Sequence, residues 1–124
     1  MFGKVGIEIM RKVTRQTAEH FNWETVCDGW HYLRRDDLSV IAEKMPPHTC
    51  EARHYHNKSR QFFYILSGQA VMRFEGEDVT LDAGSGIEIE AQEIHQMTNC
   101  SDQPLEFLMI SIPPSHGDKV DLPG

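Results

Sequence analysis

Short extended segments separated by turn residues recur along almost the whole chain, and this spacing restricts its fold more than any other feature. Within the segments hydrophobic and polar residues alternate, as in the IEIE run at 87–90, which is typical of a half-exposed strand. Turn residues such as Ser67-Gly68, Gly76 and Gly84 separate neighbouring segments. The sequence shows no sustained 3.6-residue periodicity. It therefore predicts an all-β fold, a jelly-roll barrel or a sandwich.

The expected strands follow from this alternation and from the turns that bound it. They cover 30–33, 38–45, 51–56, 61–66, 70–74, 79–81, 87–89, 95–99 and 105–112. Residues 5–13 alternate as well and are expected to form an N-terminal strand or arm. Residues 17–23 can hold one helical turn.

A chain of 124 residues is long enough for one hydrophobic core and too short for two comfortable domains. We therefore expect a single domain over 1–124. Residues 1–26 are an N-terminal arm or strand, 27–115 the barrel core, and 116–124 a tail.

Charge and composition exclude several classes of partner. The net charge of −7 disfavours nucleic acid, and the short basic pair Arg34-Arg35 is followed at once by Asp36-Asp37, as in a solvated turn. No apolar run approaches the roughly 20 residues of a membrane span, and 1–12 lack the continuous apolar region of a secretory signal. We therefore expect no membrane partner.

Cysteine usage points to a reducing compartment. The three cysteines, Cys27, Cys50 and Cys100, are odd in number and widely separated, and none lies in a Cys-x-x-Cys pair. A cytoplasmic protein is expected, with neither a zinc ribbon nor a redox dithiol.

Three of the seven histidines have a spacing that suggests metal binding. His54 and His56 are two residues apart, so in a strand both imidazoles project from one face. Gln61 and His95 each open a further β-rich segment and can face the same interior. Imidazole and oxygen donors of this kind are accepted by Zn, Fe, Ni, Mn and Cu.

At these residues the chain resembles the cupin family. The first cupin motif reads Gly, five residues, His-x-His, three or four residues, Glu, six residues, Gly. Here His54-Tyr-His56, four residues, Gln61, six residues and Gly68 reproduce it. Two positions depart from it: His48 stands at the first Gly, and Gln61 stands at the Glu.

The second cupin motif reads Gly, five residues, Pro-x-Gly, two residues, His, three residues, Asn. Gly84, His95 and Asn99 match it, whereas Glu90 and Gln92 stand at the Pro and the second Gly. The fifteen residues between the motifs are similar to the compact segment of small microbial cupins. The resemblance implies a cupin jelly-roll β-barrel over most of the chain.

The resemblance also places His54, His56, Gln61 and His95 at the metal-ligand positions of the family. It implies one divalent transition metal, Zn, Fe, Ni or Mn. An amide oxygen donates without charge, so this site should hold its ion less tightly than a site with a carboxylate, and Gln61 cannot serve as a general base. The alternative is a relic site without metal.

Further residues are expected around this site. Strand alternation puts Cys50 on the ligand face, where it is either a pocket residue or a small apolar filler. Phe63 and Ile65 share the face of Gln61, and Met109 on the last strand can also line the pocket. No catalytic residue is assigned.

The segment 113–118 is similar to the tail of mannose-6-phosphate isomerase-like cupins. Such a tail either folds over the barrel mouth, bringing His116 or Asp118 near the metal, or ends as an exposed terminus.

Three functions remain open, because fold does not decide function. The first is a metal-dependent enzyme on a small organic molecule, a dioxygenase or an isomerase. The second is a non-catalytic module that binds or senses a small molecule or sugar. The third is sugar-phosphate isomerisation, for which Arg53, Lys58, Arg60 and Arg73 are the nearest phosphate contacts. A homodimer is expected because the strand at 5–13 lacks an obvious partner.

Overall fold

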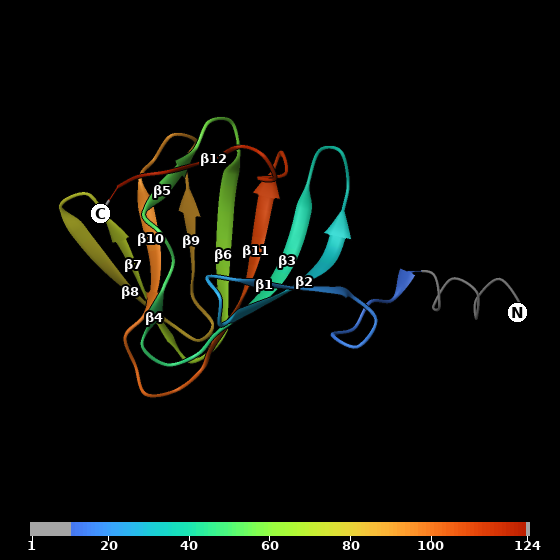
Figure 1. Ribbon diagram of the computed structural model, residues 1–124, viewed down its shortest axis with the longest axis horizontal. Coiled ribbons are helices and arrows are strands. Elements are labelled where there is room, and N and C mark those ends of the chain that lie inside the picture. The colour runs from blue at the N-terminus through green and yellow to red at the C-terminus, as the bar shows by residue number, and fades with distance from the viewer. Residues whose placement is uncertain (1–10, 124) are drawn as a thin grey trace, which may run out of the picture.

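The structure is a computed structural model that describes residues 11–123. It consists of two antiparallel sheets packed face to face (Figure 1). The first sheet has the order β1 (Glu19–Trp23), β2 (Cys27–Arg34), β3 (Ser39–Met45), β11 (Leu105–Ile112), β6 (Arg60–Ser67) and β9 (Gly86–Ile89). The second has the order β12 (Lys119–Asp121), β5 (His54–His56), β10 (His95–Asn99), β7 (Gln69–Phe74) and β8 (Glu77–Asp82), and β4 (Thr49–Cys50) also pairs with β10. The predicted all-β jelly-roll fold is confirmed.

Most predicted strands occur where the alternation places them. Those at 95–99 and 105–112 have the predicted bounds, the strand at 61–66 is one residue longer at each end, and the strand at 70–74 begins one residue earlier. The strand at 51–56 is interrupted: β4 ends at Cys50 and β5 begins at His54. Of the expected N-terminal strand at 5–13, residues 5–10 lie outside the described residues.

The helical turn predicted at 17–23 is wrong, because Glu19–Trp23 form β1. This strand pairs with β2 from Glu19 opposite His31 to Trp23 opposite Cys27. Residues 24–26 form the loop between the paired Trp23 and Cys27, and two of them, Glu24 and Thr25, are left-handed with φ angles of 46° and 69°. Neither residue is the Asn or Gly that usually marks such a turn, so the hairpin was missed.

Apart from Glu43 on β3, the inward faces of three adjacent strands change from polar to apolar along the barrel. On β6 the inward residues run from Gln61 to Ile65, and on β11 they run from Ser111 to Leu105. On β3 they are Ser39, Ile41, Glu43 and Met45. Ser111 lies opposite both Ser39 and Gln61, whereas Leu105 lies opposite Met45. The polar residues therefore gather at one end of the barrel and the apolar residues at the other.

Buried apolar side chains fill the second of these ends. This cluster has members from both sheets: Cys27, Met45, Phe63, Ile65, Ala70, Met72, Leu81, Ile89, Met97, Leu105 and Phe107. Burial of this set is the main source of stability for a domain without disulfides. The first end keeps a cavity, described below.

Two of the cupin-motif departures adopt a backbone conformation that glycine tolerates better than other residues. His48 and Gln92, which stand at glycine positions of the motifs, have φ angles of 58° and 67°. This left-handed conformation costs a non-glycine residue roughly 1–2 kcal/mol, which the surrounding structure must offset. Gly68, at a matching position, has φ +87°, and a Cβ atom there would lie 2.4 Å from the Pro104 carbonyl oxygen.

The C-terminal segment is a strand in the second sheet. After β11 the chain crosses to the second sheet, where β12 pairs with β5 (Figure 1). Lys119 lies opposite His56, and Asp121 lies opposite His54. The Asp118 carboxylate accepts hydrogen bonds from the backbone N–H groups of Lys58 (2.9 Å) and Ser59 (2.8 Å). Of the two alternatives for the tail, folding over the barrel is the one observed.

Within residues 11–123, no helix is long and apolar enough to cross a membrane.

Candidate metal centre and cavity

Three buried imidazoles from two neighbouring strands meet inside the barrel. His54 and His56 lie on β5, and His95 on β10 is the direct cross-strand partner of His54. The ring centroids of His54 and His95 are 4.3 Å apart, and those of His54 and His56 are 5.0 Å apart. One ring nitrogen from each of the three lies within 4.8 Å of the others. This convergence follows from the i, i+2 spacing and the strand register.

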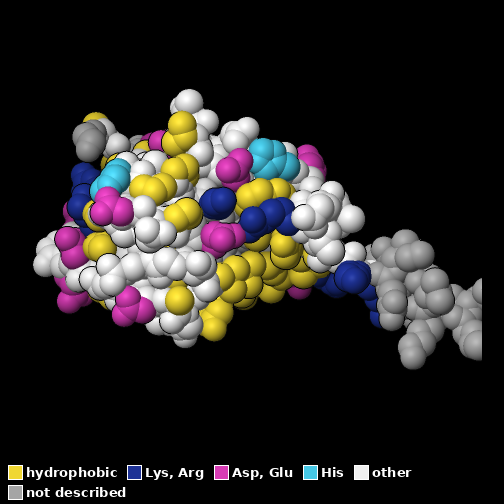
Figure 2. All heavy atoms as spheres, turned by 90° about the horizontal axis from the view of Figure 1, so that it is seen from below, with side chains coloured by type: hydrophobic (Ala, Val, Ile, Leu, Met, Phe, Trp, Pro, Cys, Tyr) yellow, Lys and Arg dark blue, Asp and Glu magenta, His cyan; other side chains and the backbone are white. Residues whose placement is uncertain are grey.

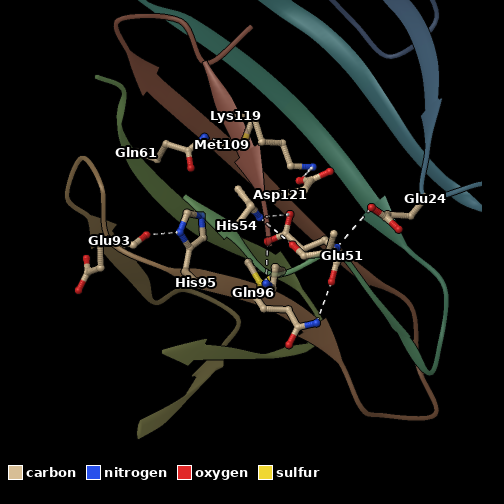
Figure 3. A network of polar contacts seen from close by, with 12 residues as sticks. Glu24, Glu51, His54, Gln61, Glu93, His95, Gln96, Met109, Lys119 and Asp121 are labelled. Carbon is tan, nitrogen blue, oxygen red and sulfur yellow. Dashed lines mark hydrogen bonds and ion pairs between the residues drawn. The ribbon is translucent and has the colours of Figure 1, made fainter. Parts of the chain in front are cut away.

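Backbone carbonyls fix the protonated nitrogen in two of these rings. Nδ1 of His54 donates to the Ala52 carbonyl oxygen at 2.8 Å, and Nδ1 of His95 donates to the Glu93 carbonyl oxygen at 2.9 Å (Figure 3). Each ring therefore presents its Nε2 lone pair to the interior. Nε2 of His95 and Nδ1 of His56 are buried and have no hydrogen-bond partner among the described residues. A buried polar atom without a partner is costly, and a bound ion would satisfy it.

Burial keeps these imidazoles neutral. For His54 and His56, loss of solvation is the largest cause, and the repulsion between the protonated ring of each and that of His95 is the next. Together they lower the pKa of His54 to about 3 and the pKa of His56 to about 4. Burial also lowers the pKa of His95. A neutral imidazole is the form that coordinates a metal ion, so the site is ready to bind one without releasing protons.

Gln61 turns its carbonyl oxygen to the interior. Its Nε2 donates to Ser111 Oγ at 3.1 Å and faces Met109 Sδ at 3.2 Å. A thioether sulfur can only accept a hydrogen bond, so the amide nitrogen must be the atom on that side. Oε1 is buried and has no partner within the described part of the chain. Figure 3 shows the Gln61 amide and the His95 ring on the same side of the view.

A cavity of about 700 Å³ is lined by His54 and His56, whereas the fully buried His95 lies outside its lining. Among its lining residues are the predicted His54, His56, Gln61, Phe63, Met109 and His116. Residues from the β1–β2 hairpin, the turn after it, β3, the stretch between β4 and β5, and the C-terminal segment complete it: Phe21, Trp23, His31, Arg34, Arg35, Ser39, Ile41, Glu43, Glu51, Pro114, Ser115 and Lys119.

Two predicted pocket residues do not line this cavity. Cys50 is exposed, because the chain leaves the strand at 51–53 and alternation does not continue from Cys50 to His54. Ile65 is fully buried in the apolar core, one inward position beyond Phe63. In both cases the cavity extends over a shorter length of strand than the sequence predicted.

The charged residues near the cavity also differ from expectation. Arg53, Lys58, Arg60 and Arg73, the expected phosphate contacts, do not line it. Arg34 and Arg35, predicted to lie in a solvated turn, are exposed as expected and also lie at the cavity. Asp118 lies outside the lining, and its carboxylate is engaged by backbone N–H groups, so the structure does not place it at the metal site.

Two acidic residues in the cavity were missed by sequence reasoning. Glu43 is in phase with Ile41 and Met45 on β3, so alternation alone could have found it. Glu51 gives no such signal, because it lies outside the strands. Glu51 Oε2 accepts a hydrogen bond from Met97 N at 2.7 Å, and its Oε1 lies 3.9 Å from His54 Nδ1. Burial raises the pKa of Glu51 to about 8.

Comparison with known proteins identifies relatives for much of the chain. The model of a family described as Cupin domain matches residues 42–111. An oxalate-binding protein of Thermotoga maritima is 33% identical over 69 residues, which are 56% of this chain and 57% of that protein. The chain thus spans about half the length of the curated relatives it matches.

Solved structures show the same fold at low sequence identity. An uncharacterised conserved protein with a double-stranded β-helix domain from Klebsiella pneumoniae superposes with a TM-score of 0.76 at 17% identity, covering 92% of this chain and 98% of that chain. The polyketide cyclase RemF from Streptomyces resistomycificus gives a TM-score of 0.80 at 15% identity, covering 93% and 87%. At this identity the likeness shows the fold alone.

Proposed function

We propose that this chain, which belongs to the cupin family, holds one divalent transition metal ion with His54, His56, His95 and Gln61 and acts on a small organic molecule in the adjoining cavity. The observation that carries the proposal is the convergence of three neutral, buried ring nitrogens within 4.8 Å of one another. Unpartnered buried atoms on His95 and Gln61 support it, because an ion at this point would complete their coordination.

The donor set fits a metal and indicates its properties. Three imidazoles and one amide oxygen bring no negative charge, so the ion would remain a strong Lewis acid and would be held less tightly than by a carboxylate site. When bound, such an ion supplies polarisation of a substrate oxygen and open coordination positions. The same donors accept Zn, Fe, Ni or Mn, and both dioxygenase and isomerase chemistry are consistent with them.

Elemental analysis tests the metal centre directly. Protein purified without chelators should contain one equivalent of a transition metal per chain, measured by inductively coupled plasma mass spectrometry. His95→Ala should lose most of this metal, because it removes a buried ligand. His20→Ala is the matched control, since His20 lies on the exposed β1 hairpin and pairs with Asp28. Wild-type protein without stoichiometric metal after supplementation with Zn, Fe, Ni and Mn would exclude the proposal.

A non-catalytic binding module is the second candidate. The relative from Thermotoga maritima is named for binding oxalate, and Gln61 replaces the charged ligand of the cupin motif. Incubation of metal-loaded protein with a mixture of small metabolites, followed by mass spectrometry, separates the two functions. Steady product formation that His95→Ala abolishes supports an enzyme. A ligand recovered unchanged after long incubation supports the binding module.

Sugar-phosphate isomerisation has less support, because its expected phosphate contacts do not line the cavity. The proposed compartment is a reducing one such as the cytoplasm, which agrees with the free thiols of Cys27, Cys50 and Cys100.

We also retain a homodimer as a proposal. The first sheet exposes large apolar side chains on β6 and β11, namely Phe62, Tyr64, Leu66 and Ile112. Figure 2 shows a contiguous stretch of hydrophobic side chains along the lower margin of the molecule. Contiguous apolar surface of this kind is typical of protein interfaces.

A further inference from the structure

Glu43 is a second polar centre of the cavity, separate from the histidines. It projects inward from β3 between Ile41 and Met45, is 8% exposed, and lines the cavity. Among residues 11–123, no side chain or backbone group forms a hydrogen bond or ion pair with its carboxyl group. With no partner among these residues, this carboxyl group faces the cavity, where a ligand that hydrogen-bonds to it would replace the water it otherwise needs.

The neighbouring Glu51 differs, because one of its oxygens already accepts a hydrogen bond from the backbone. Met97 N donates to one of its oxygens at 2.7 Å, and His54 Nδ1 lies 3.9 Å from the other. The pKa of Glu43 lies well above its usual range. Burial is the largest cause, and the charge of Glu51 is the next. A carboxyl group with a raised pKa is neutral, and its carbonyl oxygen can accept a hydrogen bond from a neutral donor such as a hydroxyl group.

The walls around Glu43 are apolar and aromatic. Opposite it on β2 stands Gly29, where a Cβ atom would lie 2.3 Å from the Phe21 ring, so the missing side chain leaves room for that ring over β2. Trp23, Phe63 and Met109 extend the apolar lining towards the histidines. A volume of about 700 Å³ lies within the range of pockets that hold drug-sized ligands.

We propose that the cavity takes a neutral, hydroxylated ring compound, whose ring lies against Phe21, Trp23 and Phe63 and whose hydroxyl group donates a hydrogen bond to Glu43. This inference rests on the proposed function, since it describes the substrate of the same site. It makes Glu43 a specificity-determining residue, and it assigns the cavity a ligand larger and less charged than a dicarboxylate.

A hydroxyl-for-methoxy comparison tests the contact. Metal-loaded protein is dialysed to equilibrium against 2-naphthol or 2-methoxynaphthalene, which share one ring system, and bound ligand is quantified by chromatography. Wild-type protein should bind 2-naphthol about tenfold more tightly than 2-methoxynaphthalene, because the methoxy compound cannot donate the hydrogen bond to Glu43. Oxalate, a small dianion, should not displace the naphthol.

Variants of Glu43 identify the acceptor. Glu43→Gln keeps the side-chain volume and should reduce the tenfold preference, and Glu43→Leu, which has no acceptor, should abolish it. Glu77→Gln is the matched control, because Glu77 is exposed on β8 away from the cavity; it should behave as wild type. Circular dichroism establishes that each variant is folded, and Glu43→Gln carries the test if Glu43→Leu is not.

Several outcomes would overturn the inference. A naphthol preference that persists in Glu43→Leu places the hydroxyl elsewhere, for example on the metal. Failure of the wild-type protein to bind either naphthyl compound, or displacement by oxalate, rejects the ring-compound class. Elemental analysis of the same samples tests the metal centre separately from the Glu43 contact. A Glu43-dependent preference in protein that contains no metal would support the hydrogen bond to Glu43 and reject the proposed function.

Discussion

At the scale of single residues, the orientation of Gln61 depends on one hydroxyl group. Ser111 is fully buried and accepts the hydrogen bond that turns the amide nitrogen away from the cavity. Partners of this kind commonly contribute 10- to 100-fold to metal affinity. Ser111→Ala is therefore expected to weaken metal binding about tenfold, measured by competition with a chromophoric chelator.

A serine elsewhere on the same pair of strands provides the control. Ser67 is exposed at the end of β6, and Ser67→Ala should leave the affinity unchanged. Unaltered affinity in Ser111→Ala would mean that the oriented amide of Gln61 does not contribute to metal binding.

The lowered pKa of His54 makes a pH prediction for metal-free protein. The folded pKa of about 3 lies below the ordinary 6.5, so His54 contributes stability above pH 6.5 that is lost as the pH falls towards 3. Between pH 7 and pH 5 the free energy of unfolding should fall by about 2 kcal/mol more in wild-type protein than in His54→Gln.

Chemical denaturation of both proteins after chelation provides the measurement. The comparison is needed because Glu51, with a pKa raised to about 8, changes stability in the opposite sense, losing its contribution as the pH rises from 4.5 to 8. Glu51 is present in both proteins, so its effect largely cancels. Parallel pH profiles would contradict a strongly lowered pKa at His54.

At the scale of elements, β12 closes the cavity only because its start is held in place. Asp118 receives two backbone hydrogen bonds from the loop before β6, and Leu122 N donates to the Arg53 carbonyl oxygen at 2.8 Å. Asp118→Ala removes the side-chain acceptor for two N–H groups, much as loss of a helix cap does, and should cost about 1 kcal/mol of stability.

Hydrogen exchange locates this effect. Amide exchange at 119–122 should accelerate in Asp118→Ala relative to the rest of the barrel, and denaturation should show the lower stability. Asp36→Ala, which changes an exposed aspartate in the β2–β3 turn, should do neither. Unchanged exchange at 119–122 would show that strand pairing with β5 alone holds the segment.

At the scale of the whole molecule, the outer face of the first sheet is the proposed contact between two copies. Sedimentation velocity at micromolar concentration should show a dimer. The double variant Phe62→Glu, Tyr64→Glu should shift it to the monomer, because each copy would place two carboxylates in an apolar interface. Val26→Glu, at an exposed apolar residue on the β1–β2 turn, should remain dimeric. A monomeric wild-type protein would contradict the proposal.

Much of the fold and about a third of the cavity lining could be predicted because they depend on neighbours in sequence. Alternation placed His54, His56, Gln61, Phe63 and Met109 on inward faces, and the structure brings all five to the cavity. The same rule failed at Cys50, where the strand is interrupted, and missed Glu43, whose phase on β3 was available but not used.

The sequence alone determined the period of each strand, and with it the faces on which the ligand-type residues lie, because a strand alternates over consecutive residues. Only the tertiary structure decided which distant segments close the cavity. The β1 hairpin brings Phe21 and Trp23, the pairing of β12 with β5 brings Lys119 opposite His56, and an irregular stretch brings Glu51 beneath His54. These contacts depend on non-local strand pairing, which leaves no period in the local sequence.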